Sequence, residues 1–408
     1  MFEEKLKQYA RLVVEVGVNI QKDQYLMIRT PLEGVYFARE LAKCAYEVGA
    51  KRVYTEYSDE QMSKITYTYA SEDALSEYPS WLAQGLTELA EKNAAFISIS
   101  AGDPDLLKGV ATSKIATAQK AAGEALATFR KYMSHSHVPW CVVSIPTPTW
   151  SQKLFPNVSK EESEKLLWDK IFEATRIDEK DPVRAWKDHV DNLERKCTFL
   201  NEKRLKKLHY TGPGTDLWVE LPQDHLWEGG GETSTKGIYF VANMPTEEIF
   251  TLPSKYGVNG KLSSTKPFSY GGNLIDDFVL LFEKGKVVDC MAKEGEELLK
   301  KLLQTDEGAS YLGEVALVPH SSPVSETGMI FFNTLFDENA SCHFAFGNSY
   351  PTTLKGGTTM TDEELEKHGA NISMIHEDFM VGGPKLSVEG FTVDNESIFL
   401  IKDGEWAF

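Results

Sequence analysis

The sequence of 408 residues lacks any uninterrupted apolar run of about 18 residues, which is the length that a membrane-spanning helix needs. Its first residues, MFEEKL, open an amphipathic pattern and lack the basic-then-apolar order of a secretory signal peptide. We therefore expect no membrane association and a cytoplasmic location.

Cysteine is scarce. The five cysteines are far apart, odd in number, and form no CxxC pair: Cys44, Cys141, Cys197, Cys290 and Cys342. This spacing excludes a zinc ribbon and a thioredoxin-like site, and it argues against a disulfide framework.

Positive charge is also in deficit. Lysine and arginine number 43 against 61 aspartates and glutamates, which leaves a formal net charge of −18. Such a surface repels phosphate backbones, so nucleic-acid binding is not expected as the main task. The same balance suits a protein that gathers cations.

Several common catalytic motifs are missing. The sequence contains no HExxH, GxxxxGK[ST] or GxSxG string, which excludes a zincin, a P-loop enzyme and a nucleophile-elbow hydrolase. The glycine clusters at 229–231 and 271–272 do not follow a strand and open a helix, so they are more typical of turns than of phosphate-binding loops.

The first half of the sequence alternates between helix-like and strand-like patterns. Apolar residues from Leu6 to Val16 recur at a spacing of three or four, which predicts a helix. Further helices are expected at 37–48, 81–92 and 113–133, and strands at 25–28, 52–57, 95–100 and 140–145. This alternation predicts a doubly wound α/β domain over residues 1–195.

The second half has short strand-like runs separated by glycine, proline, asparagine and aspartate. The dipeptides Lys284-Gly285 and Asp403-Gly404 between apolar runs indicate hairpins. Helices are expected only at 294–304 and 362–368. We predict a largely antiparallel α+β domain over residues 196–408.

Metal-capable side chains occur beside apolar strands of this second half: Glu248, Glu314, His343, His376 and Asp378. Side chains alternate along a strand, so His376 and Asp378 share one face and Glu377 points to the other. Imidazole and carboxylate groups are suitable ligands for Zn²⁺, Co²⁺ or Mn²⁺, and carboxylates can bridge two ions.

Each of these residues also has a purely structural interpretation. A histidine beside Phe344 and Phe346, as His343 is, is commonly a hydrogen-bonded core residue, and the Glu247-Glu248 pair could be solvated. Glu314 could lie at the end of a strand on the surface. Residue spacing alone leaves both interpretations open.

Four strings, NMPTEEIFT, GEVALV, HFAFGNSYP and IHEDFMVGG, occur in order around these residues. They resemble the aminopeptidase T / aminopeptidase S (PepS) family of metallo-aminopeptidases, and the resemblance extends over nearly the whole chain. It implies a cytosolic hydrolase that releases N-terminal residues from short peptides. It also implies a C-terminal metal-binding domain and a homodimer whose active sites face an enclosed cavity.

The same resemblance implies two divalent cations per subunit, Zn²⁺ or Co²⁺ and also Mn²⁺, that activate a water molecule. The family's ligands fall on Glu248, Glu314, His343, Tyr350, His376 and Asp378. Glu314 is expected to bridge the two ions, and the family pattern favours Glu248 over Glu247. No general base is assigned.

Two rival functions remain open, and the first of them would use the same ligands. One is a dimetal amidase or phosphoesterase that acts on a non-peptide substrate and needs no free α-amine. The other is a peptide-binding protein without catalysis, whose affinity for its ligand would survive mutation of the metal ligands.

Overall fold

The computed structural model describes residues 2–270 and 273–408, so the glycine pair at 271–272 lies outside the described residues. The chain divides into two compact units. Unit 1 comprises Met1–His189 and Gly231–Pro245, and unit 2 comprises Val190–Gly230 and Thr246–Phe408. The predicted assignment of residues 196–408 to a separate catalytic domain stays a prediction.

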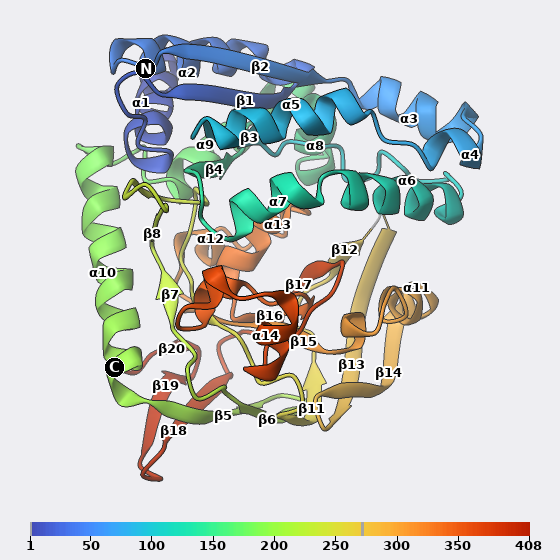
Figure 1. Cartoon of the computed structure of the whole chain (residues 1–408), viewed down its shortest axis with the longest axis vertical. Helices are drawn as coiled ribbons and strands as arrows, with labels where there is room; N and C mark the ends of the chain where they lie inside the picture. Colours follow the sequence, from blue (N-terminus) through green and yellow to red (C-terminus); the bar gives the residue numbers. More distant parts are fainter. Residues whose placement is uncertain (1, 271–272) are drawn as a thin grey trace. The chain divides into compact units, whose positions relative to one another are not determined.

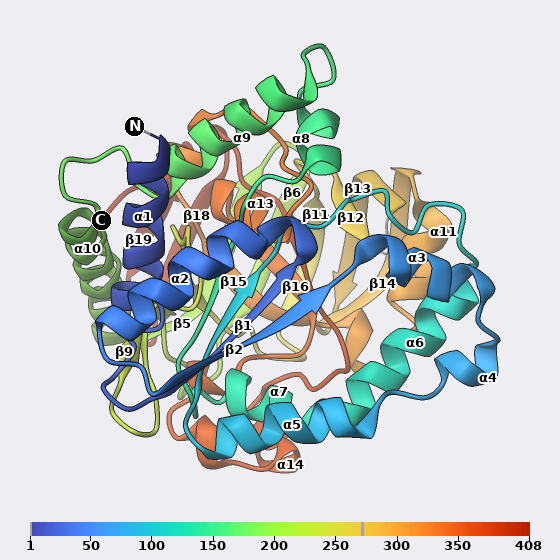
Figure 2. The ribbon, with the colours of Figure 1, turned by 90° about the horizontal axis from the view of Figure 1, so that it is seen from above.

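Unit 1 is built on a parallel sheet with the strand order β2-β1-β3-β4. Figure 2 shows two of these strands, β1 and β2, side by side. The strands of this sheet are β1 (Tyr25–Pro31), β2 (Arg52–Ser58), β3 (Ala95–Ile99) and β4 (Trp140–Val143). These are the four strands that the sequence predicts, so the α/β class of the first half is confirmed. A two-stranded hairpin, β8 (Glu232–Thr233) and β9 (Tyr239–Phe240), completes the unit.

The helices of unit 1 follow the expected alternation. They are α1 (Phe2–Leu12), α2 (Val35–Glu47), α3 (Glu60–Tyr69), α4 (Glu72–Leu75), α5 (Ser80–Glu91), α6 (Thr112–Ala125), α7 (Ala127–Ser134), α8 (Pro148–Leu154) and α9 (Lys160–Ala174). The helix expected over 113–133 is divided into α6 and α7 at Leu126, whose buried side chain packs with Phe129. Helix α10 (Pro182–Lys203) runs from unit 1 into unit 2.

Helices cover both faces of this sheet because its strands alternate apolar side chains. Tyr25 and Met27 of β1 pack with buried residues of α5 and α7. Leu26 and Ile28 point to the opposite face and are fully buried. The stacked rings of Tyr9 and Phe37, 5.0 Å apart, join α1 to α2.

Unit 2 contains two antiparallel sheets (Figure 1). The larger has nine strands: β5 (Leu205–Gly212), β6 (Thr215–Glu220), β11 (Val258–Ser263), β12 (Phe268–Tyr270), β13 (Asn273–Glu283), β14 (Lys286–Glu294), β18 (Ser387–Thr392), β19 (Ser397–Lys402) and β20 (Glu405–Trp406). The smaller has the order β17-β16-β15-β10-β7, from β7 (Glu228–Gly229), β10 (Ile249–Thr251), β15 (Leu312–Leu317), β16 (His343–Gly347) and β17 (His376–Met380). The predicted antiparallel class of the second half is confirmed.

The expected turns occur where the chain reverses. Lys284-Gly285 joins β13 to β14 and Asp403-Gly404 joins β19 to β20, with positive φ angles between 48° and 84° at all four residues. Two consecutive residues with positive φ are the geometry of a hairpin turn whose twist matches that of the strands.

Short helices connect the strands of unit 2: α11 (Glu296–Leu302), α12 (Pro323–Glu326), α13 (Thr334–Asp337) and α14 (Asp362–Lys367). Helix α11 begins later than expected because β14 continues to Glu294 and Gly295, with φ 77°, makes the turn. A side chain at Gly295 would meet the backbone oxygen of Leu274 at 2.5 Å.

The core of unit 2 lies between its two sheets. Leu208, Tyr210 and Leu217 come from the larger sheet, and Phe344 and Phe379 from the smaller one. The rings of Tyr210 and Phe344 lie 4.9 Å apart. One face of the smaller sheet is thereby committed to the core, which leaves its other face for chemistry.

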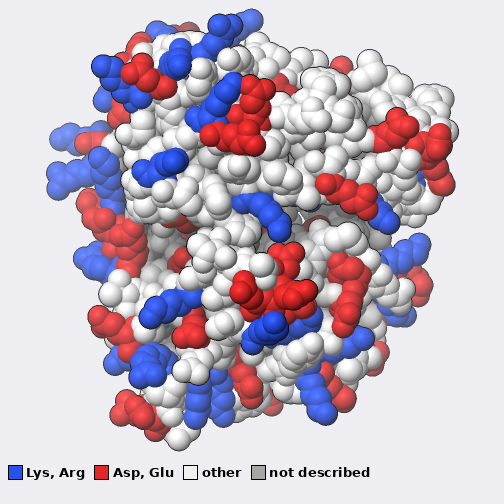
Figure 3. All heavy atoms as spheres, in the orientation of Figure 1, with Lys and Arg blue, Asp and Glu red and all other residues white. Residues whose placement is uncertain are grey.

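Among residues 2–270 and 273–408, no helix combines the length and the apolar character that crossing a bilayer requires. On the face drawn in Figure 3, acidic and basic side chains are interspersed without a large area of one sign.

Candidate metal centre

The centre is built on the face of the smaller sheet that points away from the core. Strand register places Glu314 of β15 and Asp378 of β17 on either side of Ala345 in β16. His343 lies opposite Ala316 in the next row. Because alternate residues of a strand share a face, these side chains all project to the same side.

Small residues leave room above this face. Ala316 and Ala345 separate the larger side chains, and Gly347 lies opposite His376. The intervening Phe344 points to the core. Alternation along these strands thus provides one apolar face for packing. The other face carries small residues, and the polar side chains converge above them.

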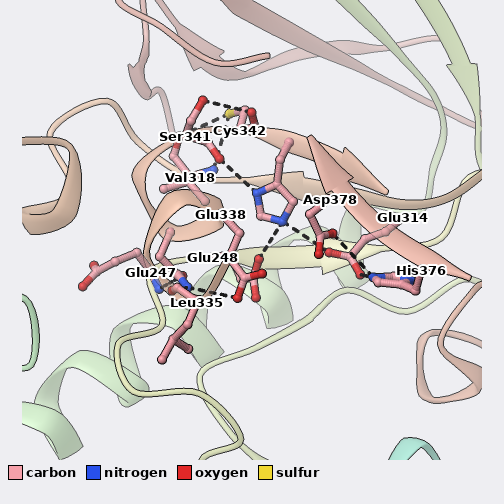
Figure 4. A network of polar contacts seen from close by, with 12 residues as sticks. Glu247, Glu248, Glu314, Val318, Leu335, Glu338, Ser341, Cys342, His376 and Asp378 are labelled. Atoms are coloured by element: carbon pink, nitrogen blue, oxygen red, sulfur yellow. Dashed lines mark hydrogen bonds and ion pairs between the residues drawn. The ribbon is translucent and has the colours of Figure 1, made fainter. Parts of the chain in front are cut away.

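Glu248 directly precedes β10, and its side chain extends to the centre. The backbone N–H of its neighbour Glu247 donates to Asn339 Oδ1 at 2.7 Å, which fixes the chain at this point. Figure 4 shows the carboxylate of Glu248 directed to the cluster and that of Glu247 directed away. The geometry therefore favours Glu248 over Glu247, as the family pattern does.

The polar atoms converge in two groups that share Glu314: Glu248, Glu314 and His343 in one, and Glu314, His376 and Asp378 in the other. His343 Nε2 lies 3.0 Å from Glu248 Oε2 and 3.5 Å from Glu314 Oε1. His376 Nε2 lies 3.4 Å from Glu314 Oε2 and 3.5 Å from Asp378 Oδ1. Each oxygen of Glu314 therefore faces a different imidazole.

Backbone carbonyls orient both imidazoles. His343 Nδ1 lies 3.0 Å from the carbonyl oxygen of Ser341, and His376 Nδ1 lies 2.7 Å from that of Asn348. A carbonyl can only accept, so each Nδ1 carries the hydrogen. When the ring is neutral, its Nε2 lone pair points into the cluster, which is the arrangement of metal-ligating histidines.

The electrostatics of the centre favour positive charge. Although burial opposes the ionised form, hydrogen bonds from His343 and His376 lower the pKa of Glu314 to about 2. Although burial opposes protonation, Glu248 and Glu314 raise the pKa of His343 well above its ordinary value. Burial also opposes protonation of His376, and Tyr350 and Asp378 outweigh it to raise that pKa as well.

Tyr350 lies beside these residues, after β16. Its ring centre is 4.8 Å from that of His376. His376 favours the phenolate, but burial and the carboxylate of Glu314 oppose it, and the net result is a raised pKa of Tyr350. The structure thus brings Tyr350 next to His376, within electrostatic influence of Glu314 and Asp378.

Sequence reasoning missed Glu338, which lies in the 3-10 turn Glu338–Ala340 after α13. Burial and repulsion by Glu248 raise the pKa of Glu338 well above its ordinary value. Figure 4 shows the two carboxylates side by side. No motif marks Glu338, because an acidic residue in the polar string FDENAS reads as a solvated loop residue.

Glu377 does not join the cluster. It pairs with Phe346 across the strands, and alternation along β17 directs it to the other face, as predicted. Burial and the neighbouring Asp378 raise the pKa of Glu377 to about 7.

Other histidines have partners of their own. His209 Nε2 lies 2.8 Å from Asp216 and its ring stacks on Trp218. His225 Nδ1 lies 2.7 Å from the carbonyl oxygen of Pro222. Neither belongs to the two ligand groups found among the described residues.

This donor set fits divalent transition-metal ions. Three carboxylates and two oriented imidazoles converge here, and Glu248, Glu314 and His343 are only 7 %, 4 % and 1 % exposed. Imidazole nitrogen and carboxylate oxygen are the ligands expected for Zn²⁺, Co²⁺ and Mn²⁺, and the shared Glu314 has the placement of a bridging ligand.

Comparisons with known proteins match a metalloprotease family and several aminopeptidases. A family model described as thermophilic metalloprotease (M29) matches residues 2–406. Aminopeptidase AmpS of Bacillus subtilis (strain 168) is 49 % identical over 100 % of this chain and 99 % of its own. Aminopeptidase T of Thermus aquaticus is 40 % identical over 99 % of each chain. The solved structure of wild-type AmpT from Thermus thermophilus superposes with a TM-score of 0.94 at 38 % identity and covers 100 % of both chains.

Proposed function

The chain belongs to the thermophilic metalloprotease (M29) family and is a metallo-aminopeptidase, and we propose that it releases N-terminal residues from short peptides with two divalent cations. The observation that carries the dinuclear proposal is the position of Glu314. Its two oxygens face two different imidazoles, and it belongs to both ligand groups.

In this proposal Glu248 and His343 would hold one ion, His376 and Asp378 would hold the other, and Glu314 would serve both. Tyr350, whose ring lies beside that of His376, would be a further ligand. When bound, the two ions supply a water molecule of lowered pKa and polarise the peptide carbonyl. The protein's share is to orient the imidazoles through the carbonyl oxygens of Ser341 and Asn348.

The test is a chelation assay on purified protein. A short peptide with a free α-amine and its N-acetylated twin are incubated before EDTA, after EDTA, and after addition of Zn²⁺, Co²⁺ or Mn²⁺. We expect metal-restored cleavage of the free-amine peptide alone, and the most effective ion identifies the metal preference.

Other results contradict the proposal. Cleavage of both peptides would indicate a broader dimetal amidase. Cleavage of neither peptide, with any metal, would indicate a binding protein without catalysis.

We further propose a cytoplasmic homodimer. The support on the chain is an exposed apolar face of α3, where Met62, Ile65 and Tyr69 are 58 %, 49 % and 82 % exposed. Their spacing places them on one side of the helix, and such a face is typical of a protein interface.

The oligomer is tested by light scattering coupled to size exclusion. We expect a dimer for the wild type and a monomer for the double variant Ile65→Glu, Tyr69→Glu. The exposed Gln119→Glu on α6 serves as the control and should stay dimeric. A monomeric wild type would refute the proposal.

A further inference from the structure

Glu338 is a carboxylate at the metal centre that belongs to neither ligand group. It is only 9 % exposed, yet the two groups of converging ligand atoms are complete without it. It comes from the turn after α13, whereas the predicted ligands come from the smaller sheet and its flanking segments. Its role therefore needs a separate explanation.

Within residues 2–270 and 273–408, hydrogen bonding to Glu338 is sparse. Among the described residues, its hydrogen-bond donor is Asn339 Nδ2, at the long distance of 3.4 Å. The same amide nitrogen carries two hydrogens and also donates to the carbonyl oxygen of Leu335 at 2.9 Å. None of the ion pairs of the centre includes Glu338. A carboxylate can accept about four hydrogen bonds, so most of its capacity is unused.

The surroundings of Glu338 are mainly acidic. Its carboxylate lies beside that of Glu248 (Figure 4), and Asp378 and Glu314 also act on it electrostatically. Burying a carboxylate among other carboxylates is unfavourable unless a cation compensates it. The cationic group of the protein that acts on Glu338 is His343, which already faces Glu248 and Glu314, so a further cation beside Glu338 would stabilise its carboxylate.

The turn that carries Glu338 is held firmly. Asn339 Oδ1 accepts from the backbone N–H of Glu247, and its amide nitrogen donates to Leu335. Asn339 is fully buried. The first bond connects the turn to the segment that supplies Glu248, and the second connects it to α13, so the backbones that carry the two neighbouring carboxylates are held together.

We propose that Glu338 binds the α-ammonium group of the substrate's N-terminal residue and restricts the enzyme to unblocked peptides. This inference rests on the proposed function. An ammonium group offers three donors and a positive charge, which complement the unused acceptors of a buried carboxylate. An acetylated N-terminus is neutral and leaves Glu338 buried without a counter-charge, so it is rejected.

The experiment compares metal-loaded wild type with Glu338→Gln at one pH. Two inhibitors are used, leucinol and its analogue without the amine, 4-methylpentanol, and their dissociation constants are measured by calorimetry. We expect the wild type to prefer leucinol. In Glu338→Gln this preference should fall by roughly 10- to 100-fold, the range for loss of a charged hydrogen bond.

Kinetics and metal content give two more readouts. The KM of a free-amine dipeptide should rise in Glu338→Gln, while the metal content measured by mass spectrometry stays at the wild-type value. The matched control is Glu326→Gln, which removes an exposed carboxylate at the end of α12 and should leave all readouts unchanged.

Two results would overturn the assignment. Loss of metal from folded Glu338→Gln would make Glu338 a ligand, and an unchanged preference for leucinol would place the amine elsewhere. Should Glu338→Gln not fold, Glu338→Asp keeps the charge and is expected to retain metal and raise KM. Failure of the proposed function is a separate result, because the wild type itself would then cleave no free-amine peptide.

Discussion

Single side chains at this centre are oriented by the backbone rather than by one another. The Nδ1 atoms of His343 and His376 contact the carbonyl oxygens of Ser341 and Asn348, so both Nε2 atoms face Glu314. Substitution of a predicted ligand should therefore remove one metal donor without moving the backbone that orients the others, which makes side-chain variants informative.

Glu314→Gln should lose metal and activity while the protein stays folded. The amide keeps the shape of the side chain but cannot offer two anionic oxygens to two ions. We expect metal affinity to fall by more than ~100-fold, beyond the usual effect of altering a residue that only supports a ligand. Metal content and turnover are the measurements. His135→Ala, in unit 1, is the control, and equal losses in both variants would contradict the choice of ligands.

Asp337 predicts a pH dependence of stability. Its carboxylate accepts from the backbone N–H groups of Phe331 and Asn333, but burial dominates and raises its pKa to about 6. Between pH ~4 and ~6 the folded state therefore binds more protons than the unfolded state. The contribution of Asp337 to the free energy of unfolding should fall by at most ~3 kcal/mol as the pH rises through this window.

Chemical unfolding of wild type and Asp337→Asn across pH 4–7 measures this effect. The stability of the wild type relative to the variant should decrease with rising pH. Asp394→Asn, which removes an exposed carboxylate, is the control. A wild-type advantage that grows with pH would show that the sign is wrong.

At the scale of elements, side chains that alternate along the strands of the smaller sheet give it one face that packs in the core and one face that carries the candidate metal centre. Phe344 and Phe346 of β16 fill the core, while His343, Ala345 and Gly347 form the other face. Gly347 has φ 94°, and a side chain there would meet the backbone oxygen of Ile375 at 2.2 Å. The absence of a side chain at Gly347 therefore allows the end of β16 and the start of β17 to approach closely.

Gly347→Ala should destabilise the protein and weaken the site. The added methyl group must displace either Ile375 or the chain around residue 347. Asn348 directly follows Gly347, and its carbonyl oxygen orients His376. We expect a loss of more than ~2 kcal/mol in unfolding free energy together with reduced metal affinity. Gly383→Ala, where no atom lies within 4 Å of the added carbon, should change stability by less than ~0.5 kcal/mol. Similar thermal shifts in both variants would refute the argument.

At the scale of the whole molecule, the predicted ligands all belong to unit 2. Metal binding should therefore stabilise that unit selectively, because ions that bind only the folded state shift its unfolding equilibrium. At 100 times the dissociation constant the gain is about 2.7 kcal/mol.

Differential scanning calorimetry with and without EDTA tests this coupling. Should the two units unfold in separate transitions, only one should move with metal, by roughly 5–10 °C. Glu314→Gln should remove the shift. A single shared transition, or a shift that persists in Glu314→Gln, would contradict selective stabilisation through this centre.

Local sequence pattern determined most of the secondary structure. Strand-like runs at 25–28, 52–57, 95–100 and 140–145 form the parallel sheet. Lys284-Gly285 and Asp403-Gly404 form hairpin turns. Alternation also placed His376 and Asp378 on one face without Glu377. These features depend on neighbours a few residues away, which is why the sequence alone suffices for them.

Tertiary structure decided the rest. Strand register put Glu314 between two histidines that are 29 and 62 positions further along the chain, and a buried turn brought Glu338 beside Glu248. Residues 231–245 joined unit 1, although the residues on either side of them belong to unit 2. Contacts of this kind arise when distant segments bury apolar surface together, and no periodicity within one segment encodes them.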